Sequence, residues 1–265
     1  MRVWQKFAAH DSMAGPEIPI GHFNTNKAPK TPYQAVGKTA AILGSTSAAA
    51  AFATAASYVK FQKEEEITNA FKQKAFQTYI HRGNKVLEIG FGPGNGANFD
   101  FYPAGIDLYA IDPLTISEKP DFNAAREKYK RKMVNLQSLT RLSCEDLSVY
   151  NDNTFDVVVS TLVLCSVQDQ EKSINEIIRV LKRGGFFVTQ EHIYAKDTFL
   201  GKTQEIFDVP QQIIADGCHL TRQTDEALNR RVGKDKGFTS IAQQEVVTLD
   251  SHWPISRQLL TVYTK

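Results

Sequence analysis

Short apolar runs alternate with segments of helical periodicity through the middle of the chain, and this alternation restricts the fold more than any other feature. Each run is as long as a single strand, and one of them contains three consecutive valines. The runs occupy residues 85–89, 108–111, 139–143, 155–160 and 186–190. Apolar residues recur at helical spacing between them, at 122–137 and 174–181. Buried strands joined by helices pair in parallel through right-handed crossovers, so we expect a parallel sheet.

Two further apolar runs, 241–249 and 259–263, follow each other without a long helix between them. Such a pair is typical of an antiparallel hairpin, which we place at one edge of the sheet. The sequence therefore predicts an α/β fold, a doubly wound, Rossmann-like sheet of seven strands with an antiparallel edge hairpin.

The first 60 residues differ in composition from the rest, and we expect two regions, 1–60 and 61–265. Residues 39–59 carry no charge, and a helix of this length can cross a hydrocarbon core of about 30 Å. Many of these residues are Ala, Gly, Ser or Thr, which makes insertion marginal. Three interpretations stay open: a weak membrane anchor, part of an organellar targeting sequence, or a surface or disordered helix. Membrane-associated or organellar localisation is expected ahead of a cytoplasmic one.

Three consecutive acidic residues, 64–66, predict the start of a helix that ends near residue 80. Carboxylates in the first turn are favoured by the helix dipole. We expect this helix to pack on the domain that follows.

Composition excludes several classes of partner and site. The net charge of +2 gives no indication of nucleic-acid binding. The three cysteines, Cys144, Cys165 and Cys218, are far apart and lack CxxC spacing, so the sequence predicts neither a disulfide framework nor a metal site. It assigns no oligomeric state.

A glycine-rich turn follows the first predicted strand, with Gly at positions 90, 92, 94 and 96. Residues without Cβ let the backbone approach a ligand closely, and ligands of doubly wound sheets bind at the carboxyl ends of the strands. An ordinary strand-to-helix turn and a dinucleotide site are the alternatives. The dinucleotide pattern fails when it is read from Gly90, because Asn95 occupies its third glycine position.

Acidic residues end or follow the neighbouring strands. Glu88 lies within the first strand, and Asp112 ends the second, where a carboxylate can accept both hydroxyls of a ribose. Cys144 and Glu145 follow the third strand, where a purine edge would arrive. Helix capping for Asp112 and a solvated loop for Glu145 are the alternative interpretations.

These motifs, together with 155–159 and 181–185, resemble in order and spacing the class I S-adenosylmethionine-dependent methyltransferases over about residues 85–190. The resemblance implies that the glycine turn holds the methionine end of S-adenosylmethionine, that the second strand's acid holds the ribose, and that the third loop meets the adenine. The implied cofactor residues are Glu88, Gly90, Gly92, Gly94, Asp112, Cys144 and Glu145.

Residues 161–167, 191–192 and 216–222 are similar to the membrane-associated alkyl-thiol S-methyltransferases and their plant and algal relatives. Residues 233–237 and 251–257 depart from that pattern. The resemblance implies methyl transfer to a small, lipophilic acceptor, thiols first. A carbon or oxygen of a quinone, sterol or lipid, and a non-catalytic membrane-attached assembly protein, are the alternatives.

His192 follows the fifth strand and is our first candidate for a base or acceptor-positioning residue, with Asp216 and His219 as second choices. Structural roles are the alternatives for all three. Cys165 is expected to pack or gate, because direct transfer needs no covalent intermediate. Residues 199–214 are apolar enough to form a lid over a hydrophobic acceptor, or to pack in a core or interface.

Overall fold

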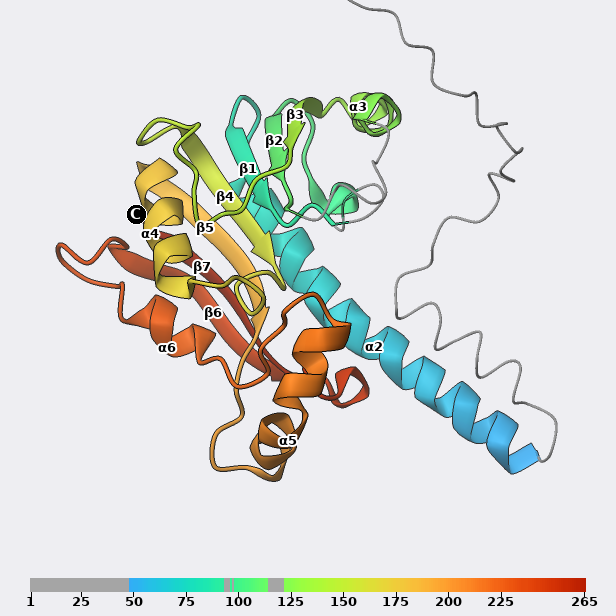
Figure 1. Cartoon of the computed structure of the whole chain (residues 1–265). Coiled ribbons are helices and arrows are strands. Elements are labelled where there is room, and N and C mark those ends of the chain that lie inside the picture. Colours follow the sequence, from blue (N-terminus) through green and yellow to red (C-terminus); the bar gives the residue numbers. More distant parts are fainter. Residues whose placement is uncertain (1–47, 93–95, 97, 114–121) are drawn as a thin grey trace, which may run out of the picture. The chain divides into compact units, whose positions relative to one another are not determined.

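A computed structural model describes residues 48–92, 96, 98–113 and 122–265 of the chain (Figure 1). The chain divides into two units, 1–54 and 55–265, and the second contains the whole sheet. Its seven strands follow the order β3-β2-β1-β4-β5-β7-β6. Their bounds are β1 Lys85–Ile89, β2 Asp107–Ile111, β3 Asn135–Thr140, β4 Phe155–Thr161, β5 Leu181–His192, β6 Ser240–Thr248 and β7 Arg257–Thr264. Strands β1 to β5 pair in parallel, and β7 and β6 pair antiparallel at one edge, which confirms the predicted fold.

Helices connect and cover the strands (Figure 1). The α-helices are α2 Ala48–Tyr79, α3 Phe122–Arg131, α4 Gln170–Val180, α5 Phe199–Ile214 and α6 Thr224–Asn229. Two short 3₁₀ helices, η1 Phe99–Phe101 and η2 Asp250–His252, lie in loops.

The sheet has a core on each face, and the alternation of side chains along a strand assigns residues to them. In β4, Val158 belongs to the core that contains Ile174 of α4 and Leu228 of α6. Its neighbour Val157 belongs to the core that contains Phe76 of α2. Both faces are buried, which explains why β4 reads as a continuous apolar run.

Helix α2 starts earlier than the sequence predicted. It begins at Ala48, so the expected start at Glu64 is wrong. Alanine is the best helix former, and nothing in the Ala-rich stretch interrupts the helix. Glu64 instead accepts a hydrogen bond from Ser251 N at 2.9 Å, and Lys60 Nζ lies 2.9 Å from Asp250 Oδ2, which ties α2 to η2.

The predicted anchor, 39–59, falls partly outside the described residues, because the description begins at Ala48. Within the described part of the chain, no helix combines the length and the apolar character needed to cross a bilayer.

Two strand boundaries also differ from the prediction. Helix α3 ends at Arg131 rather than 137, because Met133 adopts a left-handed conformation with φ 57°, and β3 therefore starts at Asn135 rather than 139. Strand β5 starts at Leu181 and includes both glycines that were expected to precede it. A Cβ on Gly185 would lie 2.7 Å from the carbonyl oxygen of Asp156, so the close approach of β4 requires glycine there.

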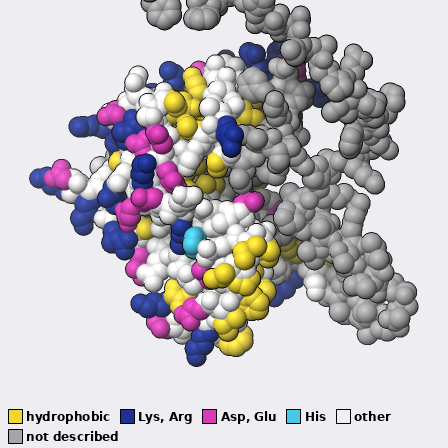
Figure 2. All heavy atoms as spheres, in the orientation of Figure 1, with side chains coloured by type: hydrophobic (Ala, Val, Ile, Leu, Met, Phe, Trp, Pro, Cys, Tyr) yellow, Lys and Arg dark blue, Asp and Glu magenta, His cyan; other side chains and the backbone are white. Residues whose placement is uncertain are grey.

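Helix α5 exposes an apolar surface. Figure 2 shows apolar side chains gathered over this helix. Its most exposed apolar residues are Phe199, Ile206, Val209, Ile213 and Ile214. Phe207 packs edge-on against the exposed ring of Trp253, with ring centroids 5.1 Å apart, which extends the surface to the loop after η2. The predicted apolar segment 199–214 is thus a helix with an open apolar face.

Candidate cofactor and acceptor site

The glycine turn after β1 lies against the residues that follow β2 and β4. Gly90 and Gly92 have φ values of 74° and 73°, which glycine adopts without strain. A Cβ on Gly90 would lie 2.2 Å from Cγ2 of Val163 in the loop after β4, whereas a Cβ on Gly92 would meet no atom of the described residues within 4 Å. Gly90 is therefore required by packing, and Gly92 faces open space. Gly94, the next predicted cofactor residue, lies outside the described residues.

Asp112 meets this turn directly. It follows β2, which pairs in parallel with β1, so both strand ends lie at the same edge of the sheet. Its Oδ2 atom accepts a hydrogen bond of 2.7 Å from Gly92 N. The carboxylate is buried and fixes the backbone of the turn, so the structure brings these two predicted cofactor residues together.

Glu88 is fully buried beneath the turn. Asn98 Nδ2 donates to Glu88 Oε1 at 3.0 Å and lies 3.1 Å from Thr161 Oγ1 at the end of β4. The other carboxylate oxygen, Oε2, is buried without a hydrogen-bond partner in the described part of the chain. Burial raises the pKa of Glu88 to about 7, although hydrogen bonding from Asn98 and the buried Tyr102 hydroxyl, and the charge of the buried Lys72 ammonium, pull it down. A buried carboxylate with one unsatisfied oxygen can bind a cationic or hydrogen-bonding ligand.

The loop after β3 uses its predicted side chains in the fold. Cys144 is buried in the core that contains α4, and burial raises its pKa to about 11. Glu145 Oε1 accepts hydrogen bonds from Gln168 N at 2.5 Å and Asp169 N at 3.1 Å, which holds the turn before α4. The Cys144 thiol and the Oε1 atom of Glu145 are thus both engaged within the fold.

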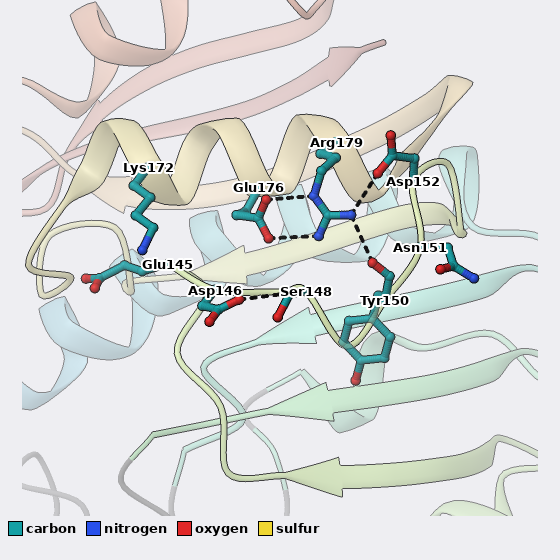
Figure 3. Close-up of a pocket in the computed structure, with 9 residues that line it drawn as sticks. All are labelled: Glu145, Asp146, Ser148, Tyr150, Asn151, Asp152, Lys172, Glu176 and Arg179. Carbon is teal, nitrogen blue, oxygen red and sulfur yellow. Dashed lines mark hydrogen bonds and ion pairs between the residues drawn. The ribbon is translucent and has the colours of Figure 1, made fainter.

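A polar hollow of about 570 Å³ lies beside α4 (Figure 3). Arg179 crosses it, donating to Glu176 Oε1 at 2.6 Å and to Asp152 Oδ1 at 2.9 Å. Arg179 is thus paired with two acids of the lining, and Glu145 is the one predicted cofactor residue in that lining. The glycine turn, Glu88 of β1 and Asp112 after β2 form a different site, at the carboxyl ends of these strands.

His192 ends β5 and is almost completely buried. Its Nε2 atom lies 3.0 Å from Sγ of Cys218, which follows α5. Cys165, from the loop after β4, completes a group whose nitrogen and sulfur atoms all lie within 4.8 Å of one another. The sequence predicted His192 at the edge of the cleft but did not predict these two thiol neighbours.

The three groups perturb one another's protonation. Burial lowers the pKa of His192, but a hydrogen bond and the charge of Cys165 outweigh it, and the net pKa is raised. The hydrogen bond from Cys165 lowers the pKa of Cys218, while the same contact and burial raise that of Cys165 well above its usual range. Cys218 is therefore the thiol that ionises first.

The second-choice residues lie nearby with different surroundings. His219 N donates to Cys165 O at 2.9 Å, and its ring Nδ1 lies 3.8 Å from Asp208 Oδ2 of α5. Asp216 is exposed in a left-handed turn with φ 50°. Of these two second-choice residues, His219 thus contacts Cys165 through its backbone N–H.

Sequence reasoning missed Glu191, which orders the loop after β4. This fully buried carboxylate accepts from Ser160 Oγ at 2.9 Å, Val163 N at 3.2 Å and Leu164 N at 3.1 Å. A charged residue inside the apolar run of β5 was the available signal.

Known proteins match the same region. Residues 87–189 match a family model described as a methyltransferase domain. The chain is 36% identical over 155 residues to thiol S-methyltransferase TMT1A of Homo sapiens, which covers 58% of this chain and 62% of the relative. It is 35% identical over 184 residues to thiol S-methyltransferase TMT1B of Mus musculus, and the match covers 68% of this chain and 71% of the relative. The chain belongs to this family of methyltransferases.

A solved structure has the same fold as this methyltransferase. N-methyltransferase NodS from Bradyrhizobium japonicum, in complex with S-adenosyl-L-homocysteine, matches with a TM-score of 0.51 at 14% identity, over 76% of this chain and 86% of that one. The family requires S-adenosylmethionine, and the residues present fit it: Glu88 offers an unsatisfied buried oxygen, and Gly92 leaves open space beside Asp112.

Proposed function

We propose that this methyltransferase transfers the methyl group of S-adenosylmethionine to the sulfur of a small, lipophilic thiol. The similarity to thiol S-methyltransferases over more than half of the chain carries the choice of acceptor. The matched part of the first of these relatives is less than two thirds of its length, so the acceptor is inferred for this chain and has to be measured.

The cofactor would be held by residues at the ends of β1 and β2. Glu88 would use its second oxygen at the methionine end, Gly92 would let the ligand approach the backbone, and Asp112 would accept the ribose hydroxyls. When bound, the cofactor supplies an electrophilic methyl group on a positively charged sulfur. The carboxylates of Glu88 and Asp112 favour that charge at their side of the site.

The acceptor would approach from the ends of β4 and β5. Methyl transfer from a sulfonium is an in-line displacement, so alignment and exclusion of water are the protein's main contributions, worth up to about 7 to 11 kcal/mol. A thiol with a pKa near 8.5 is ionised to a few per cent at neutral pH, a deficit of only about 2 kcal/mol. His192, buried beside two thiols, would orient the acceptor or take its proton.

Helix α5 supports a lipophilic acceptor. Its last turn leads into Ala215 and Cys218, which pack with Cys165, Leu220 and Ile255 in a small apolar cluster. Helix α5 thus leads directly into the loop that carries Cys218, and its exposed apolar residues would be available to a lipophilic acceptor.

The test is a methyl-transfer assay with aliphatic and aromatic thiols, matched alcohols and a sterol as acceptors, together with cofactor binding by calorimetry. Asp112→Ala should weaken cofactor binding by about 10- to 100-fold, since a buried charged hydrogen bond is worth about 1.5 to 3 kcal/mol. His192→Ala should leave cofactor affinity unchanged and lower turnover. Turnover with the sterol or alcohols and none with thiols would refute the proposed acceptor.

A further inference from the structure

We propose that Cys165, His192 and Cys218 form a binding site for one thiophilic metal ion of the zinc type, whose remaining position takes the sulfur of the acceptor. The first part concerns the three side chains alone. The second part rests on the proposed thiol methylation.

The donor set is the first argument. Two thiols and one imidazole are preferred ligands of zinc, and a site with three protein ligands and one open position is typical of catalytic zinc. The three side chains are 2%, 1% and 7% exposed, for Cys165, His192 and Cys218 respectively. Among the described residues, no other group of three His, Cys, Asp or Glu side chains converges in this way.

The distances suit a tetrahedral ion. Bond lengths of about 2.0 to 2.3 Å to zinc place neighbouring ligand atoms about 3.5 to 3.8 Å apart. The three ligand atoms lie within 4.8 Å of one another, and the contact between His192 Nε2 and Cys218 Sγ is 3.0 Å. Binding would thus require the closest pair to separate by about half an ångström, a change that side-chain rotation can supply.

The loops that carry the ligands are fixed before any ion binds. Glu191 accepts hydrogen bonds from Val163 N and Leu164 N, immediately before Cys165. His219 N, immediately after Cys218, donates to Cys165 O at 2.9 Å. Arg222 Nη1 donates to Leu164 O at 2.9 Å. These hydrogen bonds fix the loops of the two cysteines and the end of β5, where His192 follows Glu191. Metal sites require such contacts around their ligands.

The charges also balance. A divalent ion with two thiolates and a neutral imidazole carries no net charge, so its burial avoids most of the cost of desolvating an isolated ion. An added acceptor thiolate brings one negative charge, and the Arg222 guanidinium interacts electrostatically with both cysteines. The site can therefore hold the anionic sulfur that methyl transfer needs.

The position of the site matches the reaction. The loop after β4 contacts the cofactor turn through Val163, at Gly90, and carries Cys165 two residues later. On binding the ion, the acceptor would lose its thiol proton to solvent and keep the electron pair on sulfur. That pair then forms the bond to the methyl carbon, while the bond between the methyl carbon and the donor sulfur breaks and leaves its electrons on the donor.

The experiment measures zinc in the full-length protein, purified with a reductant, supplied with zinc sulfate and dialysed. We expect about one zinc per chain by mass spectrometry, and X-ray absorption with two sulfur ligands at about 2.3 Å and one nitrogen at about 2.0 to 2.1 Å. Cys165→Ser and Cys218→Ser should each lose the metal. The matched control, Cys144→Ser, replaces the other buried cysteine and should keep it.

Wild-type X-ray absorption decides the matter if a serine variant fails to fold. A folded wild type without bound zinc, or with only oxygen and nitrogen ligands, would overturn the site, as would a Cys165–Cys218 disulfide in the reduced preparation. The two proposals fail separately. Zinc bound through two sulfurs and one nitrogen, without methylation of any thiol, would refute the acceptor and the second part of this inference, and would leave the metal site standing. Thiol methylation by a zinc-free protein would refute the metal site alone.

Discussion

Cofactor binding should tighten about tenfold between about pH 6 and about pH 8, because Glu88 must ionise to hold a cationic ligand. Burial raises the pKa of Glu88 to about 7. The ionised fraction is then about 9% at pH 6 and about 91% at pH 8, and the apparent dissociation constant scales with the inverse of that fraction. Binding near neutral pH should release about half a proton, since the cation lowers the pKa of the carboxyl group.

The raised pKa of Glu88 also makes the free energy of unfolding depend on pH. In the unfolded chain the pKa of Glu88 returns to its ordinary value of 4.5, so between about pH 4.5 and about pH 7 the folded protein holds more protons. The contribution of protonated Glu88 to stability is complete below its pKa in the unfolded chain. It is lost as the pH rises through its pKa in the folded protein. The loss is about 3 kcal/mol, and bound cofactor should restore part of it.

Isothermal titration calorimetry at three pH values, each in two buffers of different ionisation enthalpy, measures affinity and proton release together. Glu88→Gln should bind more weakly and lose the pH dependence. The buried ammonium of Lys72, whose pKa burial lowers to about 8, stabilises the Glu88 carboxylate. Lys72→Met should therefore shift the tightening to higher pH. A wild-type affinity that is constant over this range, or an unchanged pH dependence in Glu88→Gln, would refute the reasoning.

Three further predictions concern the loops and the N-terminal segment. Gly90→Ala should lower the free energy of unfolding by about 1 to 3 kcal/mol or more, because the new methyl group collides with Val163 and the backbone is strained. Gly92→Ala adds the backbone strain alone and serves as the control. Chemical denaturation of both variants measures the difference. Glu191→Gln should lower turnover more than cofactor affinity, because the hydrogen bonds of this carboxylate order the loop of Cys165 and, among the described residues, none of them joins a predicted cofactor residue; equal losses in both would contradict this. If the predicted stretch 39–59 is a membrane anchor, removing residues 1–60 should move the protein from the membrane to the soluble fraction; an unchanged distribution would count against the anchor.

The strands were predictable where local signals bound them. Strand β1 matches its prediction because a turn precedes it and Gly90 follows it. The start of β3 was not predictable, because it depends on the left-handed conformation of Met133, a residue type that rarely adopts it. Glu145 was predicted near a ligand, yet its carboxylate meets backbone groups that lie more than twenty residues further along the chain.

The contact between Asp112 and Gly92 follows from parallel pairing of adjacent strands and was accessible to sequence reasoning. The cluster of Cys165, His192 and Cys218 was not, because its members come from three segments without ligand spacing. Only the path of the chain after α5 brings Cys218 back to the ends of β4 and β5. Propensity and motif spacing contain no information about that return.

Under the proposed function, the contact between Gly90 and Val163 would couple binding of the acceptor to binding of the donor. A thiol that displaced the loop after β4 would also displace the backbone of the turn proposed to face the donor, and the reverse would hold as well. Thermodynamic linkage then requires each ligand to change the affinity for the other by the same factor. Selection for a bulkier acceptor would thus alter donor affinity even if every donor-binding residue stayed the same.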